Sequence, residues 1–137
     1  GEATQLTDFG CWPKGWAPDG NGVLCELALP SQEMMLVSRE GEEFWRYDLA
    51  STGLQRWGPL NRPRFSWDGS TIYQSAYHED GLGGIWGIPL QGGEPSLVVE
   101  SAELLPPSMF SVGPDRLYVT VGEHESDIWV MDVEVER

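Results

Sequence analysis

The chain has 137 residues, of which 40% are hydrophobic and 11% aromatic, so it is long enough and apolar enough to bury the core of one domain. Its 22 acidic residues against 8 basic ones give a net charge of −14, which repels phosphate groups and excludes nucleic acid as an expected partner. The 17 glycines and 10 prolines indicate a chain that turns often, which favours an all-β fold of many short strands.

The sequence contains no apolar run of about 18 residues and no signal-peptide pattern, so we predict no membrane span and assign no compartment. Its two cysteines, Cys11 and Cys25, lack the CxxC and histidine spacings of a zinc site. If residues 19–22 form a hairpin turn, the residue opposite Cys25 lies near Trp16 and not near Cys11. We therefore expect two free thiols, and we predict no metal and no cofactor.

Three turn signals recur along the chain, each containing an aspartate. They are Trp-Ala-Pro-Asp-Gly at 16–20, Phe-Ser-Trp-Asp-Gly at 65–69 and Ser-Val-Gly-Pro-Asp at 111–115, and successive aspartates lie 49 and 47 residues apart. A β-branched or aromatic run with the alternation of a strand follows each turn, at 22–27, 71–77 and 116–121. Each turn is therefore predicted to join two antiparallel strands.

A strand centred on a tryptophan also recurs, at residues 44–49, 85–90 and 128–133. Trp45, Trp86 and Trp129 lie 41 and 43 residues apart. A period of about 40–45 residues, with four short strands in each unit, is typical of β-propeller blades. We interpret the three tryptophans as packing between successive blades, with a sugar-stacking set as the alternative.

The second unit is the clearest, with strands predicted from the inside outward at 62–67, 71–77, 84–90 and 95–99. The third unit has strands at 109–112, 116–121 and 128–133 and no fourth strand. Residues 3–7 are predicted to be the outer strand of an adjoining blade. The predicted units are thus residues 1–10 (that outer strand), 11–60, 61–100 and 101–137.

The first unit fits the repeat least well. It contains an excess of roughly ten residues, around 28–35, when compared with the other two units. A rival alignment makes residues 33–38 its second strand and residues 29–32 the preceding turn. We adopt the alignment that keeps Asp19 and Gly20 in the turn.

These segments resemble the repeats of TolB-like, WD-repeat-type β-propellers. Residues 65–69 are similar to the Phe-Ser-Pro-Asp-Gly turn of that family, with Trp67 in place of its usual proline, and residues 92–95 match its Gly-Gly-Glu-Pro. Residues 125–132 are similar to the closing strand of such propellers in the C-terminal part of bacterial sensor proteins. The resemblance implies about three four-stranded antiparallel blades, half of a six-bladed ring, and a role in protein binding or ligand sensing. It implies no catalytic residue.

Two loops between the second and third strands of the predicted blades carry the candidate binding residues. A propeller places these loops on one face, so the imidazoles and carboxylates of residues 78–80 and 123–127 are expected to converge, where they would bind a divalent cation or a cationic ligand. The plainer interpretation is a pair of solvated loops, because loops run over the surface. Trp57 is a candidate exposed aromatic contact. The candidate ligand-binding residues are His78, Glu79, Asp80, Glu123, His124, Glu125, Asp127 and Trp57.

No catalytic residue is predicted. A carboxylate from each of these loops would suit glycoside hydrolysis, but the sequence fixes no separation between them. Ser126, His124 and Asp127 are too close in one loop to align as a catalytic triad. Residues 81–84, Gly-Leu-Gly-Gly, lack the lysine and the following helix of a phosphate loop. The leading hypothesis is a non-enzymatic binding scaffold for a protein or a small ligand, and the alternative is a hydrolase or a metal- or sugar-binding propeller.

Three blades do not close a ring, and an open row of blades leaves strand edges and an apolar face uncovered. We therefore expect self-association, with a homodimer as the simplest case, or completion of the ring by the rest of a longer chain. In the homodimer, residues 3–7 would complete the last blade of the partner.

Overall fold

The computed structural model describes residues 1–56, 62–100, 110–122 and 126–133, with the side chains of all of these except residues 120–122 and 126–129. Within these ranges the chain forms short strands and one turn of 3₁₀ helix. The elements are β1 (Trp12–Trp16), β2 (Gly22–Glu26), β3 (Glu33–Ser38), β4 (Glu43–Asp48), η1 (Leu49–Thr52), β5 (Leu54–Arg56), β6 (Arg64–Phe65), β7 (Thr71–His78), β8 (Gly83–Pro89), β9 (Ser96–Glu100), β10 (Phe110–Val112), β11 (Arg116–Gly122) and β12 (Ser126–Asp132).

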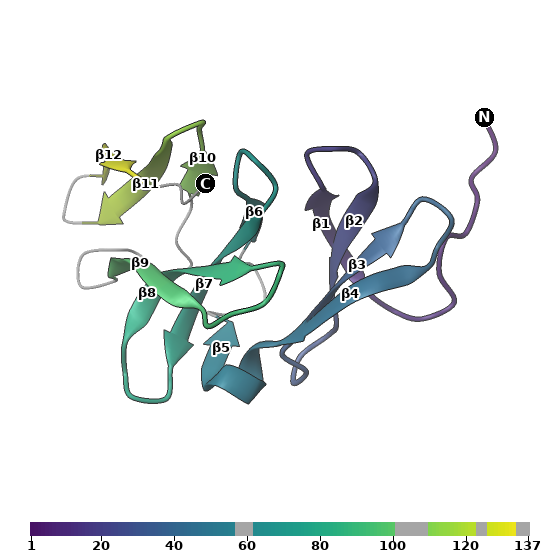
Figure 1. The fold of residues 1–137 in the computed structure, drawn as a ribbon, viewed down its shortest axis with the longest axis horizontal. Helices are drawn as coiled ribbons and strands as arrows, with labels where there is room; N and C mark the ends of the chain where they lie inside the picture. The colour runs from purple at the N-terminus through teal and green to yellow at the C-terminus, as the bar shows by residue number, and fades with distance from the viewer. Residues whose placement is uncertain (57–61, 101–109, 123–125, 134–137) are drawn as a thin grey trace.

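The strands form three antiparallel sheets that follow one another along the chain (Figure 1). The first sheet has the order β1-β2-β3-β4, the second contains β5 and β6 beside β7-β8-β9, and the third has the order β10-β11-β12. The predicted all-β class is therefore confirmed for the described residues. No helix among these residues is long and apolar enough to span a bilayer.

The first two predicted turns have the same backbone geometry. The amide of residue 17 donates to the carbonyl of residue 22 at 2.8 Å, and the amide of residue 66 donates to the carbonyl of residue 71 at 2.7 Å. Gly20 and Gly69 occupy the same place in the two turns with φ of 75° and 77°, a left-handed conformation that favours glycine. The two turns therefore place β2 and β7 in equivalent positions of their sheets.

The third turn is shorter. Gly113 donates its amide proton to the carbonyl of Arg116 at 2.8 Å, which leaves only two residues at the tip. Asp115 consequently does not take the place of the aspartates in the other two turns. The predicted turn is present, but its alignment on the aspartate was wrong.

The predicted strands of the second sheet are confirmed for β7, β8 and β9, whereas its inner strand is divided into two pieces. Leu54 of β5 pairs with His78, and Phe65 of β6 pairs with Ile72, so the two pieces lie along the same edge of β7. The second sheet therefore begins at β5, earlier in the chain than the predicted unit boundary at residues 60–61.

The first sheet corrects the predicted tryptophan repeat. Residues 33–38 form its third strand and not an insertion, and Trp45 lies on the fourth strand, opposite Leu36. Trp86 lies on a third strand, opposite Gln74, and Trp129 takes the corresponding place opposite Val119. Trp86 and Trp129 are thus equivalent, but Trp45 is not. The turn alignment that we adopted, with Trp16 opposite Val23, is confirmed.

The N-terminal segment packs against the first sheet. A side chain at Gly41, in the β3–β4 turn, would meet the carbonyl oxygen of Leu6 at 2.1 Å, and Cys11 forms a disulfide with Cys25 of β2, with Cα atoms 5.5 Å apart. Residues 6–11 therefore run across the sheet face that carries Met35 and Val37, neither of which is exposed. Figure 1 shows this segment beside the first sheet.

The predicted pair of free thiols was wrong because β1 is irregular. A register shift after Pro13 places this residue opposite Cys25, which brings Cys11 within bonding reach. Residues 1–10 form no strand in this structure of a single copy. The expected pairing of residues 3–7 with another blade therefore stays a prediction.

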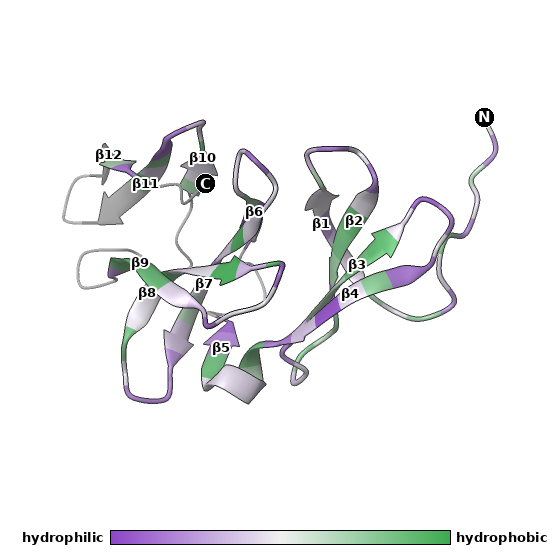
Figure 2. Cartoon of the chain, viewed as in Figure 1, coloured by the Kyte–Doolittle hydropathy of each residue, from purple (hydrophilic) through white to green (hydrophobic). Residues whose placement is uncertain are grey.

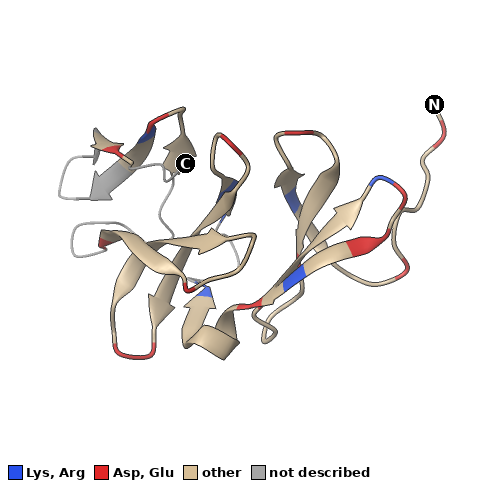
Figure 3. Cartoon of the chain, in the orientation of Figure 1, with Lys and Arg blue, Asp and Glu red and all other residues tan. Residues whose placement is uncertain are grey.

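The core consists of two layers between adjacent sheets. Leu24 and Leu36 pack with Ile72 and Ile88 between the first and second sheets, and Ile85 packs against residues of β10 and β11 between the second and third. Figure 2 shows the hydrophobic positions along these strands. Acidic residues gather in the turns at the strand ends (Figure 3), so much of the negative charge lies away from both layers.

Candidate binding site between the second and third sheets

The residues His78, Glu79 and Asp80 lie where β7 turns into β8. The amide of Asp80 donates to Nδ1 of His78 at 3.2 Å, and the amide of Leu82 donates to the Asp80 carboxylate at 2.9 Å. The hydrogen bond from Leu82 is the main reason why the pKa of Asp80 lies below its usual value. His78 and Asp80 therefore bond within their own turn.

Most of the other candidate residues fall outside the part of the chain that the structure describes. These are Trp57, Glu123, His124 and Glu125, and only the backbone of Asp127 is described. The convergence of the two loops therefore stays a prediction. Among the described residues, no group of three or more histidine, cysteine, aspartate or glutamate side chains is arranged to hold a metal ion.

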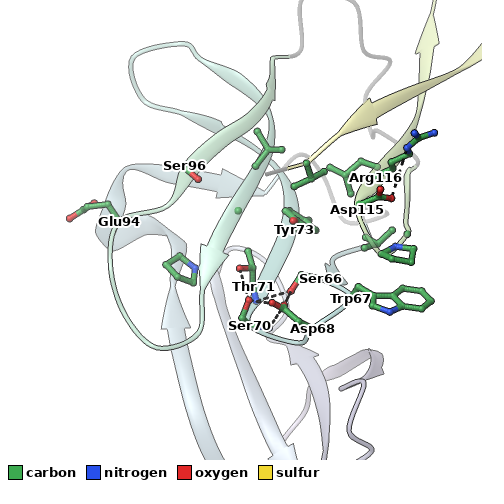
Figure 4. Close-up of a pocket in the computed structure, with 18 residues that line it drawn as sticks. Ser66, Trp67, Asp68, Ser70, Thr71, Tyr73, Glu94, Ser96, Asp115 and Arg116 are labelled. Carbon is green, nitrogen blue, oxygen red and sulfur yellow. Dashed lines mark hydrogen bonds and ion pairs between the residues drawn. The ribbon is translucent and has the colours of Figure 1, made fainter. Parts of the chain in front are cut away.

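A cavity of about 920 Å³ opens between the second and third sheets, at the end where the β6–β7 and β10–β11 turns lie. Figure 4 shows the two walls, with Asp68 and its neighbours on one side and Asp115 with Arg116 on the other. The lining residues are Ser66, Trp67, Asp68, Ser70, Thr71, Tyr73, Gly87, Pro89, Glu94, Ser96 and Val98 from the second sheet, and Val112, Gly113, Pro114, Asp115, Arg116, Leu117 and Val133 from the third.

Among the described residues, large side chains occupy the equivalent place between the first and second sheets. Leu24, Leu36 and Trp45 stand opposite one another on β2, β3 and β4 and form a row across the first sheet. Leu24 and Leu36 are buried, and the Trp45 indole N–H donates to the carbonyl of Leu90 in the second sheet at 3.1 Å.

The equivalent row on the second sheet consists of Tyr73, Gly87 and Ser96. Because the two turns have the same geometry, Tyr73 takes the place of Leu24, and the strand pairing then matches Gly87 with Leu36 and Ser96 with Trp45. Gly87 has no positive φ, so its backbone does not require glycine. The cavity exists because glycine and serine stand where the first sheet carries leucine and tryptophan.

The turn beside the cavity holds Asp68 in a fixed position. One carboxylate oxygen, Oδ1, accepts hydrogen bonds from the Ser66 hydroxyl at 2.7 Å, the Ser70 amide at 3.0 Å and the Ser70 hydroxyl at 2.7 Å. These bonds, led by that from the Ser70 amide, lower the pKa of Asp68 to about 2. Asp68 is therefore a charged group with a defined orientation near neutral pH.

Tyr73 lies deeper in the same wall and reaches toward the third sheet (Figure 4). Only 6% of the residue is exposed, and its hydroxyl makes no hydrogen bond with another described residue. Burial, and then the charge of Asp68, raise the pKa of Tyr73 above its usual value. The phenol is thus neutral near neutral pH and is available to a ligand.

The opposite wall, on the third sheet, carries Arg116, whose positive charge lies beside two aspartates. Arg116 is 3.2 Å from the carboxylate of Asp132 and 3.9 Å from that of Asp115. Trp67, 63% exposed, extends from the mouth on the side of the third sheet, whereas Glu94 points away from Tyr73 (Figure 4). The arrangement offers hydroxyl groups, one fixed carboxylate and an aromatic surface, which are groups that bind a polar ligand.

Comparisons with family models, with curated proteins and with solved structures found no match for this chain. The cavity between the second and third sheets remains the candidate site. Sequence reasoning missed it, although one signal was present, because a glycine within a strand often marks a place where a ligand approaches closely. Gly87 is such a residue, between Trp86 and Ile88 of β8.

Proposed function

We propose that the chain is a non-enzymatic binding module built from β-propeller blades of the TolB-like type, with its ligand site in the cavity between the second and third sheets. The observation that carries this proposal is the replacement of Leu36 and Trp45 by Gly87 and Ser96 at equivalent positions of successive sheets. A repeat architecture fills its interfaces by default, so an interface left hollow by small residues is a candidate for binding.

The arrangement of the inner strands supports blades rather than unrelated sheets. Residues next to or within β1, β6 and β10 line a second cavity of about 360 Å³, among them Lys14, Phe65 and Ser111. In a propeller the innermost strands of all blades surround a central axis. A propeller therefore predicts that the first strands of consecutive sheets surround one space, and the lining of this cavity supports that arrangement.

The outer face of the third sheet supports self-association. Tyr118 takes the register position on β11 that Tyr73 takes on β7, yet it is 43% exposed where Tyr73 is 6% exposed. The difference arises because a following sheet covers Tyr73. We propose that a sheet of a second copy covers Tyr118 in the same way.

The binding role is tested by a ligand-observed NMR screen of small metabolites against the wild-type chain and Gly87→Leu. We expect ligands that bind the wild-type protein and lose binding in Gly87→Leu, because the leucine refills the cavity. His78→Ala, in the distant β7–β8 turn, is the matched control. Ligands lost in His78→Ala and kept in Gly87→Leu would contradict the proposal and favour a metal-, sugar- or hydrolase-type site on the acidic loops.

A further inference from the structure

We propose that the ligand of this cavity is a small organic cation, whose ammonium or guanidinium group binds between Asp68 and Tyr73. This inference rests on the proposed binding role of the cavity and adds the chemical class of the ligand. It is carried by three features of the walls: a fixed carboxylate, a phenol hydroxyl that no described residue bonds, and the charges around them.

The first feature is the carboxylate of Asp68. Its Oδ1 atom accepts three hydrogen bonds from Ser66 and Ser70, while its other oxygen receives none from the described residues. No arginine or lysine among those residues forms an ion pair with it. A carboxylate whose orientation is fixed by the protein, with one oxygen free, binds an N–H donor without a further loss of side-chain entropy.

The second feature is the hydroxyl of Tyr73. Tyr73 is 6% exposed as a residue, its hydroxyl has no hydrogen-bond partner among the described residues, and Tyr73 lines the cavity, so this hydroxyl can bond to a ligand there. The hydroxyl faces the cavity that Asp68 also lines. An ammonium or guanidinium group carries several N–H donors, as a ligand that bonds to two acceptors requires.

The third feature is the distribution of charge. Arg116 is the cation among the described lining residues, and the carboxylates of Asp132 and Asp115 lie beside it, so none of these residues offers an unpaired positive group to an anion. A net charge of −14 also repels anions and attracts cations. A neutral polyol would hydrogen-bond to the hydroxyl groups without using the charge of Asp68. Trp67 adds an exposed aromatic ring to the lining of the cavity.

The test is isothermal titration calorimetry with agmatine, which has a guanidinium and an ammonium group, beside sorbitol and succinate as a neutral and an anionic probe. We expect binding of agmatine alone, with an affinity that falls as salt is added. Tyr73→Phe should weaken binding about tenfold, since it removes one hydrogen bond to a charged group. Tyr118→Phe, at the same register position of the third sheet, should bind like the wild type.

Two further results would overturn the inference. If sorbitol or succinate binds and agmatine does not, the ligand class is wrong, although loss of that binding in Gly87→Leu would still support the cavity as the site. Equal agmatine affinity in Tyr73→Phe and the wild type would also overturn it. Circular dichroism checks each variant, and Gly87→Ala replaces Gly87→Leu if the larger side chain prevents folding, since an added Cβ meets its nearest neighbours at 3.4 Å.

Discussion

At the scale of single residues, the buried pair of Glu26 and Arg56 joins the first sheet to the second. Both residues are less than a tenth exposed, and Nη1 of Arg56 lies 2.6 Å from Oε2 of Glu26. Nη2 of the same guanidinium donates to the carbonyls of Leu27, at 2.9 Å, and Ser31. One side chain of β5 thereby fixes the loop that connects β2 to β3. Neither residue was singled out from the sequence, because partners 30 positions apart in the chain leave no local pattern.

We expect Arg56→Met to lower the free energy of unfolding by about 3–5 kcal/mol, because it removes the nearer cation of buried Glu26 and leaves only Lys14, at 3.8 Å. Urea denaturation measures the change. Arg46→Met is the matched control, since Arg46 pairs with Glu43 and Glu33 on the exposed surface and its loss should matter little. Similar losses in both variants would show that burial of the pair is unimportant.

Asp68 gives the second residue-scale prediction, a dependence of stability on pH. Its pKa in the folded protein is about 2, below the value of about 3.9 expected in the unfolded chain. The ionised carboxylate therefore stabilises the fold above pH ~4, and this contribution is lost as the pH falls toward ~2. Asp68→Asn, which cannot titrate, should lose less stability over that range in urea denaturation. Parallel losses in the two proteins would contradict the assignment.

At the scale of elements, the two interfaces between sheets differ by one row of side chains. Most strands were predictable, since alternation and turn residues mark β7, β8 and β9 within a residue or two. The position of Trp45 was not predictable: the repeat predicted it on the third strand of the first sheet, and it lies on the fourth. Trp45 and Trp86 have similar neighbours in the sequence, and a local pattern does not reveal which strand of a sheet will carry it. The cavity was also not predicted, because Gly87 and Ser96 stand out only when their positions are compared with the equivalent positions of the first sheet.

Substitutions at the equivalent positions Leu36 and Gly87 test this comparison of rows. Leu36→Ala should reduce the free energy of unfolding by about 2–5 kcal/mol, because it opens a cavity in a filled interface. Gly87→Ala should be neutral or stabilising, because its methyl group enters existing space and reduces the entropy of the unfolded chain. Thermal unfolding of the two variants beside the wild type measures both effects. A large loss in Gly87→Ala would mean that the row is already full.

At the scale of the whole molecule, the two outer faces of the row of sheets differ. Residues 6–11 cross the outer face of the first sheet, whereas the outer face of the third exposes Tyr118 and Val130 by 43% and 49%. Terminal units of a repeat array need such a cover to stay soluble, and the first sheet has one. Sequence periodicity predicted the number of units, but it could not predict that the N-terminal segment would lie on its own first sheet.

We therefore expect the chain to self-associate through the third sheet. Sedimentation velocity at micromolar concentration should detect a dimer, and Tyr118→Glu combined with Val130→Glu should convert it to a monomer by burying charge at the contact. Leu82→Glu, an equally exposed apolar residue in the β7–β8 turn, is the control and should leave the dimer intact. A wild-type monomer under these conditions would refute the expectation.

The disulfide between Cys11 and Cys25 limits how two copies can be joined. It closes residues 11–25, which contain β1 and the β1–β2 turn, into a covalent loop, so while the bond is intact β1 cannot separate from β2 and insert alone into another copy. A slip of β1 by one residue would turn each of its side chains to the opposite face, and the bond prevents that as well. Domain swapping must then begin elsewhere in the chain, and a reducing environment would remove this restriction on the first hairpin.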